Sequence, residues 1–252
     1  MKKLLASDLD GTLVLNNEIT EKNEQAVKRL NENSEIFVVS TGRPLNGVEF
    51  IESKFDIKVD YYVLLNGALI LNKNRKVIKH EKINKEVVNT ILQNYILENM
   101  LVSVETGYIT YLLTEEAELP YPNLIKVKGL EEIKEDISLI SIYCRDYSIE
   151  KIESIKEEIN KKYDTVVAYR NSQYIDVVPK GCSKGNAVKY IARKKEIDSK
   201  NIFTIGDSWN DLTMFNITKN SFTFHEVEEN LKKNTSYIVD SVAECIDDYI
   251  LN

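Results

Sequence analysis

Short apolar runs alternate with amphipathic segments in the first part of the chain. The runs LLA, IFVV and YYVLL each end at polar residues. Such runs are typical of strands that are buried on both faces of a sheet. We therefore predict strands at residues 2–8, 35–40 and 60–65. Between the first two, Thr20 is placed to cap a helix over residues 21–33.

The last part of the chain shows the same alternation. Ser183 is placed to cap a helix over residues 183–195, and the run IFTI follows it as a strand at residues 202–205. Two more short strands are expected at residues 221–224 and 237–239. Because strands alternate with helices at both ends of the chain, we predict one parallel sheet with helices on both faces.

The middle of the chain has a different pattern, in which a helix is followed by two strands, and this pattern occurs twice. The helices are expected over residues 84–99 and 148–162, and a pair of short apolar runs follows each of them. This order predicts a small α+β domain whose antiparallel sheet is covered by helices.

Together the patterns predict an α/β fold with a Rossmann-like parallel-sheet core and an inserted α+β domain. We place the core at residues 1–80 and 183–252 and the insertion at residues 81–182. In open α/β sheets, ligands bind at the carboxyl ends of the strands. The residues that follow the predicted strands are therefore the candidates for function.

Composition and charge narrow the classes of function. The chain has 252 residues, a net charge of −7 and no basic tail, which argues against a nucleic-acid partner. Its apolar runs are too short to span a bilayer, and Asp8 and Asp10 interrupt any signal peptide, so we expect a soluble cytoplasmic protein without a membrane partner. Three widely spaced cysteines and two histidines argue against a disulfide framework, a zinc site and a histidine triad. No obligate protein partner is indicated.

Two acids stand close together at the end of the first predicted strand. Asp8 and Asp10 lie two positions apart and point to the same side if the strand continues through them. Carboxylates about 4 Å apart repel each other by roughly 4 kcal/mol at an effective dielectric constant of 20. A cation or a shared proton would relieve this repulsion. The alternative is a solvated turn, because Asp and Gly are common in turns.

Three more polar segments follow strands or precede helices in the predicted core. Thr41 and the backbone N–H groups after it could bind an anion, or Thr41 could simply cap a helix. Lys184 would occupy the first position of a helix, where a cation opposes the helix dipole unless it meets an anion or is exposed. Asp207 ends a strand, and Ser208 with Asp211 fits a capping box.

These segments should meet at one edge of the sheet. Carboxylate oxygens without histidine or thiolate suit Mg²⁺. A hydroxyl group, backbone amides and a lysine would bind a phosphate group. The residues themselves therefore favour a site for a magnesium ion and a phosphate ester.

The motifs resemble those of the haloacid dehalogenase superfamily, in its Cof-type branch with a large C2B cap. DLDGT is similar to the first motif of this family, STGR to the second, SKG to the third and GDSWND to the fourth. LeuAsnGlyAla, at residues 65–68, is similar to a further stretch that is common in this branch. The motifs occur in the family's order and extend over nearly the whole chain.

The resemblance implies a role for each matched residue. Asp8 would be the nucleophile and form an aspartyl-phosphate, and Asp10 would be the general acid and base. Mg²⁺ would be bound by Asp8, Asp207 and the backbone carbonyl group of Asp10. Asp211 would support Lys184 or the outer shell of the metal. The residues expected to bind the phosphoryl oxygens are Thr41, Gly42, Lys184 and Asn210. The role of Arg43 stays open, and it could be structural.

The resemblance also implies a reaction. We expect a Mg²⁺-dependent phosphatase for small phosphorylated metabolites, sugar phosphates in the first place. The alternatives are a phosphosugar mutase and a phosphometabolite-binding regulator with slow turnover. Residues 81–182 would form a cap that closes over the site. Possible cap contacts with substrate, each equally compatible with a surface or core position, are Tyr108, Tyr143, Arg145, Arg170 and Tyr174.

Overall fold

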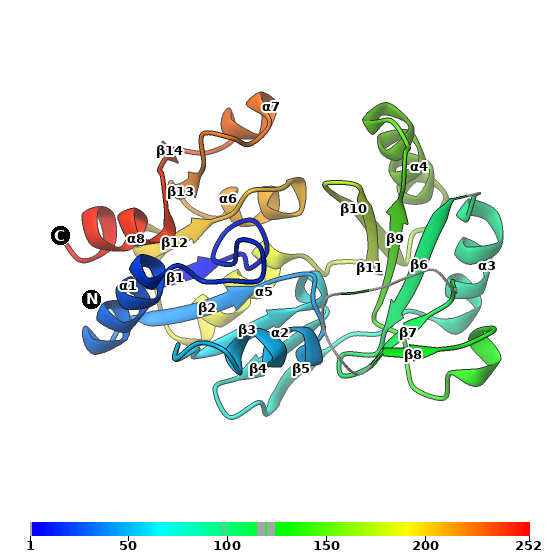
Figure 1. Cartoon of the computed structure of the whole chain (residues 1–252), viewed down its shortest axis with the longest axis horizontal. Coiled ribbons are helices and arrows are strands. Elements are labelled where there is room, and N and C mark those ends of the chain that lie inside the picture. The colour runs from blue at the N-terminus through cyan, green and yellow to red at the C-terminus, as the bar shows by residue number, and fades with distance from the viewer. Residues whose placement is uncertain (1, 98, 115–118, 120–123) are drawn as a thin grey trace.

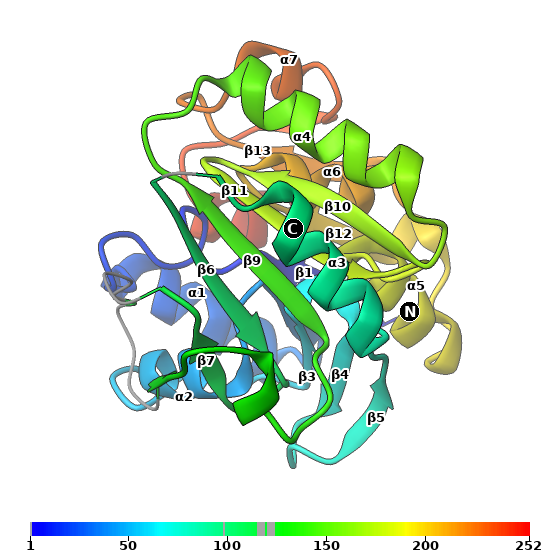
Figure 2. The same cartoon turned by 90° about the vertical axis from the view of Figure 1, so that its right-hand side faces the viewer.

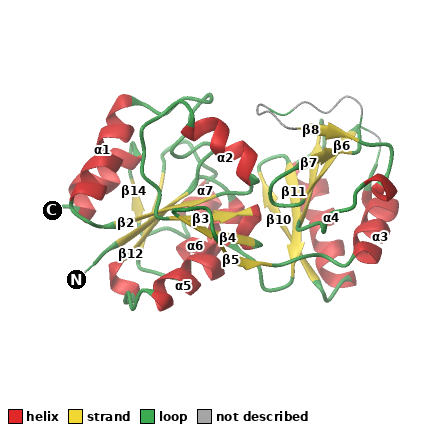
Figure 3. Cartoon of the chain, turned by 90° about the horizontal axis from the view of Figure 1, so that it is seen from below, coloured by secondary structure: helices red, strands yellow, loops and turns green. Residues whose placement is uncertain are grey.

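The chain forms two sheets that lie side by side. The computed structural model describes residues 2–97, 99–114, 119 and 124–252. The N-terminal and C-terminal parts build the sheet on the left of Figure 1, and the middle of the chain builds the sheet on the right. The same two units are seen from below in Figure 3. Within the described residues, no helix combines the length and the apolar character that crossing a membrane would require.

The first sheet has the order β14-β13-β12-β1-β2-β3-β4-β5. The first six strands in this order are parallel, and β4 and β5 continue the sheet as an antiparallel edge. The central strands are buried along their whole length, as the apolar runs predicted. The strands are β1 (Leu4–Ser7), β2 (Ile36–Ser40), β3 (Tyr61–Leu64), β4 (Leu69–Asn72), β5 (Val77–His80), β12 (Ile202–Ile205), β13 (Asn220–Thr223) and β14 (Tyr237–Ile238).

Helices cover both faces of this sheet and confirm the predicted fold class. One face packs against the buried sides of α1 and α2 and against the C-terminal segment that begins with α8. The other face packs against α5 and α6. The helices of this unit are α1 (Glu21–Glu32), α2 (Leu45–Glu52), α5 (Lys184–Lys194), α6 (Leu212–Phe215), α7 (Glu229–Lys232) and α8 (Val242–Glu244). Thr20 and Ser183 cap α1 and α5, as predicted.

The second sheet has six strands in the order β10-β11-β9-β6-β7-β8. Helices α3 and α4 pack on its face away from the first sheet, as Figure 2 shows. We call these strands and helices the six-stranded unit. Its elements are α3 (Lys85–Tyr95), β6 (Met100–Glu105), β7 (Thr110–Leu112), β8 (Leu124–Lys126), β9 (Leu139–Cys144), α4 (Ile149–Lys162), β10 (Val166–Asn171) and β11 (Tyr174–Pro179).

The structure differs from the sequence prediction mainly in this unit. Strand β9 was not predicted, although it lies between β11 and β6 and joins the two predicted helix–strand–strand repeats into one sheet. Helix α3 ends at Tyr95 rather than near residue 99, and position 98 lies outside the described residues. The helix ends there because Ile96 adopts an extended backbone conformation with φ −84° and ψ 114°.

Candidate active site

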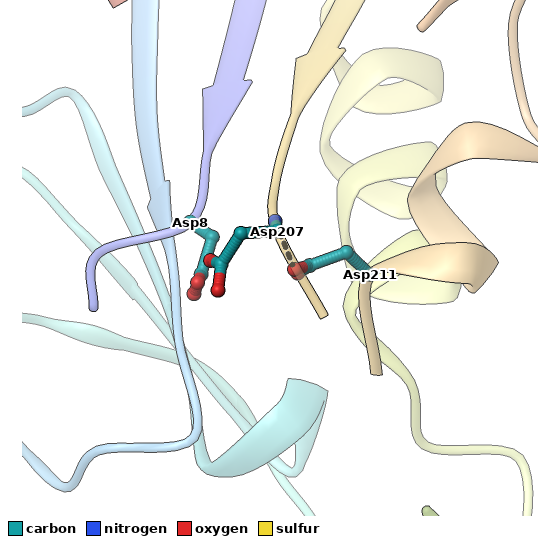
Figure 4. Close-up of side chains that lie close together, drawn as sticks. All are labelled: Asp8, Asp207 and Asp211. Carbon is teal, nitrogen blue, oxygen red and sulfur yellow. Dashed lines mark hydrogen bonds between the residues drawn. The ribbon is translucent and has the colours of Figure 1, made fainter. Parts of the chain in front are cut away.

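Two aspartates from distant parts of the sequence meet at the end of neighbouring strands. Strands β1 and β12 are parallel and paired so that Ser7 lies opposite Ile205. Asp8 follows β1 directly, and Asp207 follows β12 after one glycine. Figure 4 shows both side chains pointing into the same space below the strand ends. The topology of the sheet, rather than proximity in sequence, therefore brings these two acids together.

A buried lysine links this pair to a third aspartate. Nζ of Lys184 donates hydrogen bonds to Oδ1 of Asp8 and to Oδ1 of Asp211, each over 2.7 Å. Lys184 is only 1% exposed, because it begins α5 directly behind the strand ends. Oδ2 of Asp211 accepts the backbone N–H groups of Asp207 and Ser208, each at 3.0 Å, which completes the predicted capping box. One carboxylate thus orients both the lysine and the loop that carries Asp207.

Burial and mutual repulsion shift the proton affinities of these groups. Burial first, and the negative charge of Asp211 second, raise the pKa of Asp8 well above its ordinary value, although Lys184 opposes the shift. The same two causes raise the pKa of Asp207 to about 6. Burial acts to lower the pKa of Lys184, but the carboxylates of Asp211 and Asp8 outweigh it and raise that pKa. The site therefore holds more negative charge than one lysine neutralises.

The donor set fits a hard divalent cation. One carboxylate oxygen each from Asp8, Asp207 and Asp211 lies within 4.8 Å of the others. These ligands are oxygens on a largely buried surface, which matches the preference of Mg²⁺ and similar ions. Asp211 already uses both of its oxygens for Lys184 and the backbone. Asp8 and Asp207 are therefore the better direct ligands of the three, and Thr12 holds Asp207 in place with a hydrogen bond of 2.7 Å.

The side chain of Asp10 forms a separate ion pair with Arg43. Its two oxygens accept hydrogen bonds from Nε and Nη2 of Arg43 at 2.7 and 2.6 Å. This two-point pairing fixes the plane of the carboxylate. Arg43 is mostly buried and also donates to the backbone carbonyl group of Gly47 at 3.0 Å. The residue whose role the sequence left open thus holds the predicted general acid and base.

The predicted phosphate-binding residues divide into two layers. Thr41 and Gly42 follow β2 and line the cavity beside Asp8. Lys184 and Asn210 are buried behind the cavity surface. Nδ2 of Asn210 donates to Oδ1 of Asn66 at 3.2 Å, and Nδ2 of Asn66 donates to Oδ2 of Asp176 at 2.9 Å. This chain of side chains connects the loop after β12 with β11 of the six-stranded unit.

A cavity of about 650 Å³ separates the strand ends from the six-stranded unit. Asp8, Asp10 and Asp207 line one side of it. Of the possible cap contacts named from the sequence, those that line the other side are Tyr143, Arg145 and Tyr174. Arg170 instead forms ion pairs with Glu153 and Glu228, and Tyr108 is 43% exposed. The cavity is large enough for a small phosphorylated metabolite.

Sequence reasoning missed several residues of this site. Glu105 and Asp176 lie within strands of the six-stranded unit and belong to no recognised motif. Asn66 lies in the LeuAsnGlyAla stretch, which the family resemblance flagged without assigning a role. The residue type was the available signal, because Asn adopts the left-handed conformation more readily than most residues, and Asn66 has φ 48° and ψ 36° in the structure.

The chain is similar to known hydrolases and phosphatases over nearly its whole length. The family model for haloacid dehalogenase-like hydrolases matches residues 5–246. A putative phosphatase from Streptococcus pyogenes is 27% identical over 268 residues, covering 99% of each chain. The 5-amino-6-(5-phospho-D-ribitylamino)uracil phosphatase of Bacillus subtilis is 23% identical over 270 residues, covering 95% of this chain and 93% of that protein.

Solved structures show the same fold. A haloacid dehalogenase-like hydrolase from B. subtilis superimposes with a TM-score of 0.88 at 22% identity and covers 98% of this chain and 100% of its own. A sugar phosphatase of subclass IIB in the same superfamily gives a TM-score of 0.78 at 19% identity, with 96% and 95% coverage. The fold is therefore shared over essentially the whole length.

Proposed function

Because the chain belongs to the haloacid dehalogenase-like hydrolases, we propose that it is a Mg²⁺-dependent phosphatase that hydrolyses monoesters of small metabolites, sugar phosphates in particular. The observation that carries the proposal is the contact of Lys184 with Asp8 beside Asp207, formed by segments that are remote in sequence. Similarity to a phosphatase of a phosphoribityl compound and to a sugar phosphatase fold supports the substrate class.

The proposed reaction assigns a step to each of the residues at the strand ends. An oxygen of Asp8 attacks phosphorus and forms an aspartyl-phosphate, while the bond from phosphorus to the ester oxygen breaks. Asp10 gives a proton to the departing oxygen, and it then takes a proton from the water that attacks the aspartyl-phosphate. This second step releases inorganic phosphate and restores Asp8. Thr41 and Gly42 would hold the phosphoryl oxygens in line with the attack, and Lys184 and Asn210 would reach them from the buried layer behind.

Asp8 and Asp207, with the backbone carbonyl group of Asp10, would hold the cation. When bound, Mg²⁺ supplies positive charge that lets a carboxylate approach a phosphate group. Asp211 would act indirectly, since it orients Lys184 and the backbone of Asp207.

The six-stranded unit would act as the cap of this enzyme. We assign residues 81–182 to the cap and residues 1–80 and 183–252 to the catalytic core. The support is that the unit has its own sheet and hydrophobic core, and that its inner face lines the cavity above Asp8. Closure of such a cap would exclude water and bring further contacts to the substrate.

Phosphate release from a panel of phosphate monoesters tests the function. We expect steady release of inorganic phosphate with Mg²⁺, loss of release in excess EDTA and recovery when Mg²⁺ is added back. Isomerisation of a phosphosugar without phosphate release would indicate a mutase instead. Tight binding of an ester without turnover would indicate a regulator. Hydrolysis that persists in excess EDTA would contradict the proposed metal site.

A further inference from the structure

The strand register of the six-stranded unit places a row of polar side chains on the side of the cavity opposite Asp8, which we call the roof. Ser103 of β6 lies opposite Ser141 of β9, and Ser141 lies opposite Asp176 of β11. Residues opposite each other on neighbouring strands share a face of the sheet. Glu105 lies two positions after Ser103 and therefore shares this face as well. All four line the cavity, and we call them the polar row.

The polar row interrupts a face that is otherwise apolar or aromatic. On one side of it, the neighbouring positions on the same face of the three strands are Leu101, Tyr143 and Tyr174. The two tyrosine rings are 4.8 Å apart and tilted by 33°. On the other side, Leu139 lies opposite Glu105. Burying an acid or a serine within a sheet costs free energy unless its side chain is hydrogen-bonded. The hydrogen-bond partners of these side chains therefore indicate their role.

The two acids of the row take their hydrogen bonds from uncharged donors. Oε1 and Oε2 of Glu105 accept the hydroxyl groups of Ser103 at 3.0 Å and Thr110 at 2.5 Å. Oδ1 and Oδ2 of Asp176 accept the hydroxyl group of Ser141 at 2.8 Å and the amide of Asn66. A carboxylate offers about four acceptor positions, and these bonds use two of them in each acid. The serine oxygens can also accept a further bond each.

The polar row begins next to the phosphate-binding loop. A Cβ atom built on Gly42 would lie 3.3 Å from Oδ2 of Asp176. A leaving group that extends from a phosphate on Asp8 and Gly42 therefore meets the row before it reaches the more distant end of β9. Arg145, the cation that lines the cavity from this unit, follows that end of β9 by one residue.

We infer that Ser103, Glu105, Ser141 and Asp176 form the leaving-group subsite and select phosphate monoesters whose leaving group is uncharged and carries several hydroxyl groups. The inference rests on the proposed phosphatase function. It adds the identity of the residues that determine which phosphate monoesters are preferred. Hydroxyl groups of such a leaving group donate to the free acceptor positions of the two acids and to the serine oxygens. A second phosphate or a carboxylate would face the two acids and is rejected by their negative charge.

The proton affinity of the row agrees with this assignment. Burial raises the pKa of Glu105 to about 7, and the charge of Asp176 adds to the shift. Near neutral pH, Glu105 therefore exchanges between a form that only accepts hydrogen bonds and one that also donates. Both forms match a hydroxyl group, which can donate and accept.

Three esters of one chain length test the inference: D-sorbitol 6-phosphate, hexyl phosphate and 6-phosphogluconate. We expect kcat/KM for the sorbitol ester to exceed that for each of the others by about tenfold or more, since each hydrogen bond missing from a buried partner costs about that much. Glu105→Gln and Ser141→Ala should each reduce the preference over hexyl phosphate by about tenfold. Glu157→Gln, on the exposed side of α4, is the matched control and should keep the preference.

The outcomes separate this inference from the proposed function. Equal kcat/KM for the three esters, or an unchanged preference in both variants, overturns the inference while the phosphatase stands. Hydrolysis of p-nitrophenyl phosphate but not of the sorbitol ester does the same. Failure to hydrolyse any ester overturns the proposed function and, with it, the inference. Ser141→Ala keeps the test open if Glu105→Gln does not fold.

Discussion

The two sides of the cavity are built in different ways. The floor consists of residues that follow strand ends, namely Asp8, Thr41 and Asp207, and a buried lysine pairs with Asp8 and offsets part of the negative charge of its acids. The roof consists of alternating residues within strands, and its acids are balanced by hydroxyl groups and an amide. A floor with ionic partners suits a charged phosphate and a cation, whereas a roof with neutral partners suits a neutral leaving group.

This difference also separates chemistry from selection. Changes in the floor should remove turnover for every ester, because every ester presents the same phosphoryl group. Changes in the roof should alter which ester is preferred, because only the leaving group reaches it. The predictions below test this division, from the largest expected effect to the smallest.

Asp8→Asn should remove turnover for all esters. The amide is nearly isosteric but is not a nucleophile, so kcat should fall by about 10⁴-fold or more. Steady-state phosphate release measures the loss, and thermal unfolding serves as the control for the fold. A variant that keeps even a hundredth of the activity would mean that the floor does not act through this residue.

Lys184→Met should affect stability as well as activity. Removing the lysine leaves Asp8 and Asp211 buried without their cation, which costs about 3–5 kcal/mol of unfolding free energy. Urea unfolding measures this loss, and added Mg²⁺ should restore part of it because the ion replaces some of the missing positive charge. An unchanged unfolding midpoint in the absence of metal would show that the ion pairs do not hold the floor together.

Arg170→Gln should loosen the contact between the two units away from the cavity. Arg170 is buried in β10, pairs with Glu153 and with Glu228 of the other unit, and lies 5.5 Å from the Trp209 ring. We expect a loss of about 2–3 kcal/mol in the free energy of unfolding. Arg193→Gln, on the exposed side of α5, is the control. Equal losses in the two variants would show that the ion pairs of Arg170 contribute nothing specific to stability.

Glu105→Gln should change how stability depends on pH. Because the folded pKa of about 7 lies above the unfolded value near 4.5, the folded state holds a proton that the unfolded state releases. The stability from this proton is complete below the unfolded pKa and is lost as pH rises through 7. Between pH 5 and 8 the native protein should lose about 2 kcal/mol more than the variant. Parallel pH profiles of urea unfolding would contradict this environment for Glu105.

Much of the floor was predictable from sequence. Asp8, Lys184 and Asp207 lie in short motifs next to apolar runs. The same short segment therefore shows both where a strand ends and which polar side chain follows it. The roof was not predictable, because Ser103 and Asp176 acquire meaning only from the pairing of β6, β9 and β11. Since β9 itself was missed, no register could be assigned.

Arg43 illustrates the same limit within a recognised motif. Its position after Gly42 was clear from sequence, but its contact with Asp10 depends on how two loops after β1 and β2 fold toward each other. Side-chain pairs of this kind are set by tertiary packing and not by local pattern. The sequence therefore indicated the residues at the strand ends more readily than the side chains that support them.

The most direct test of the central claim is to trap the covalent intermediate on Asp8. The enzyme is mixed with a ³²P-labelled ester and Mg²⁺, quenched in acid during turnover and digested, and the labelled peptide is sequenced. We predict label on the peptide that contains Asp8, sensitive to hydroxylamine as an acyl phosphate is, and no label in Asp8→Asn. Label on another residue, or hydrolysis of the ester without any labelled protein, would contradict the account.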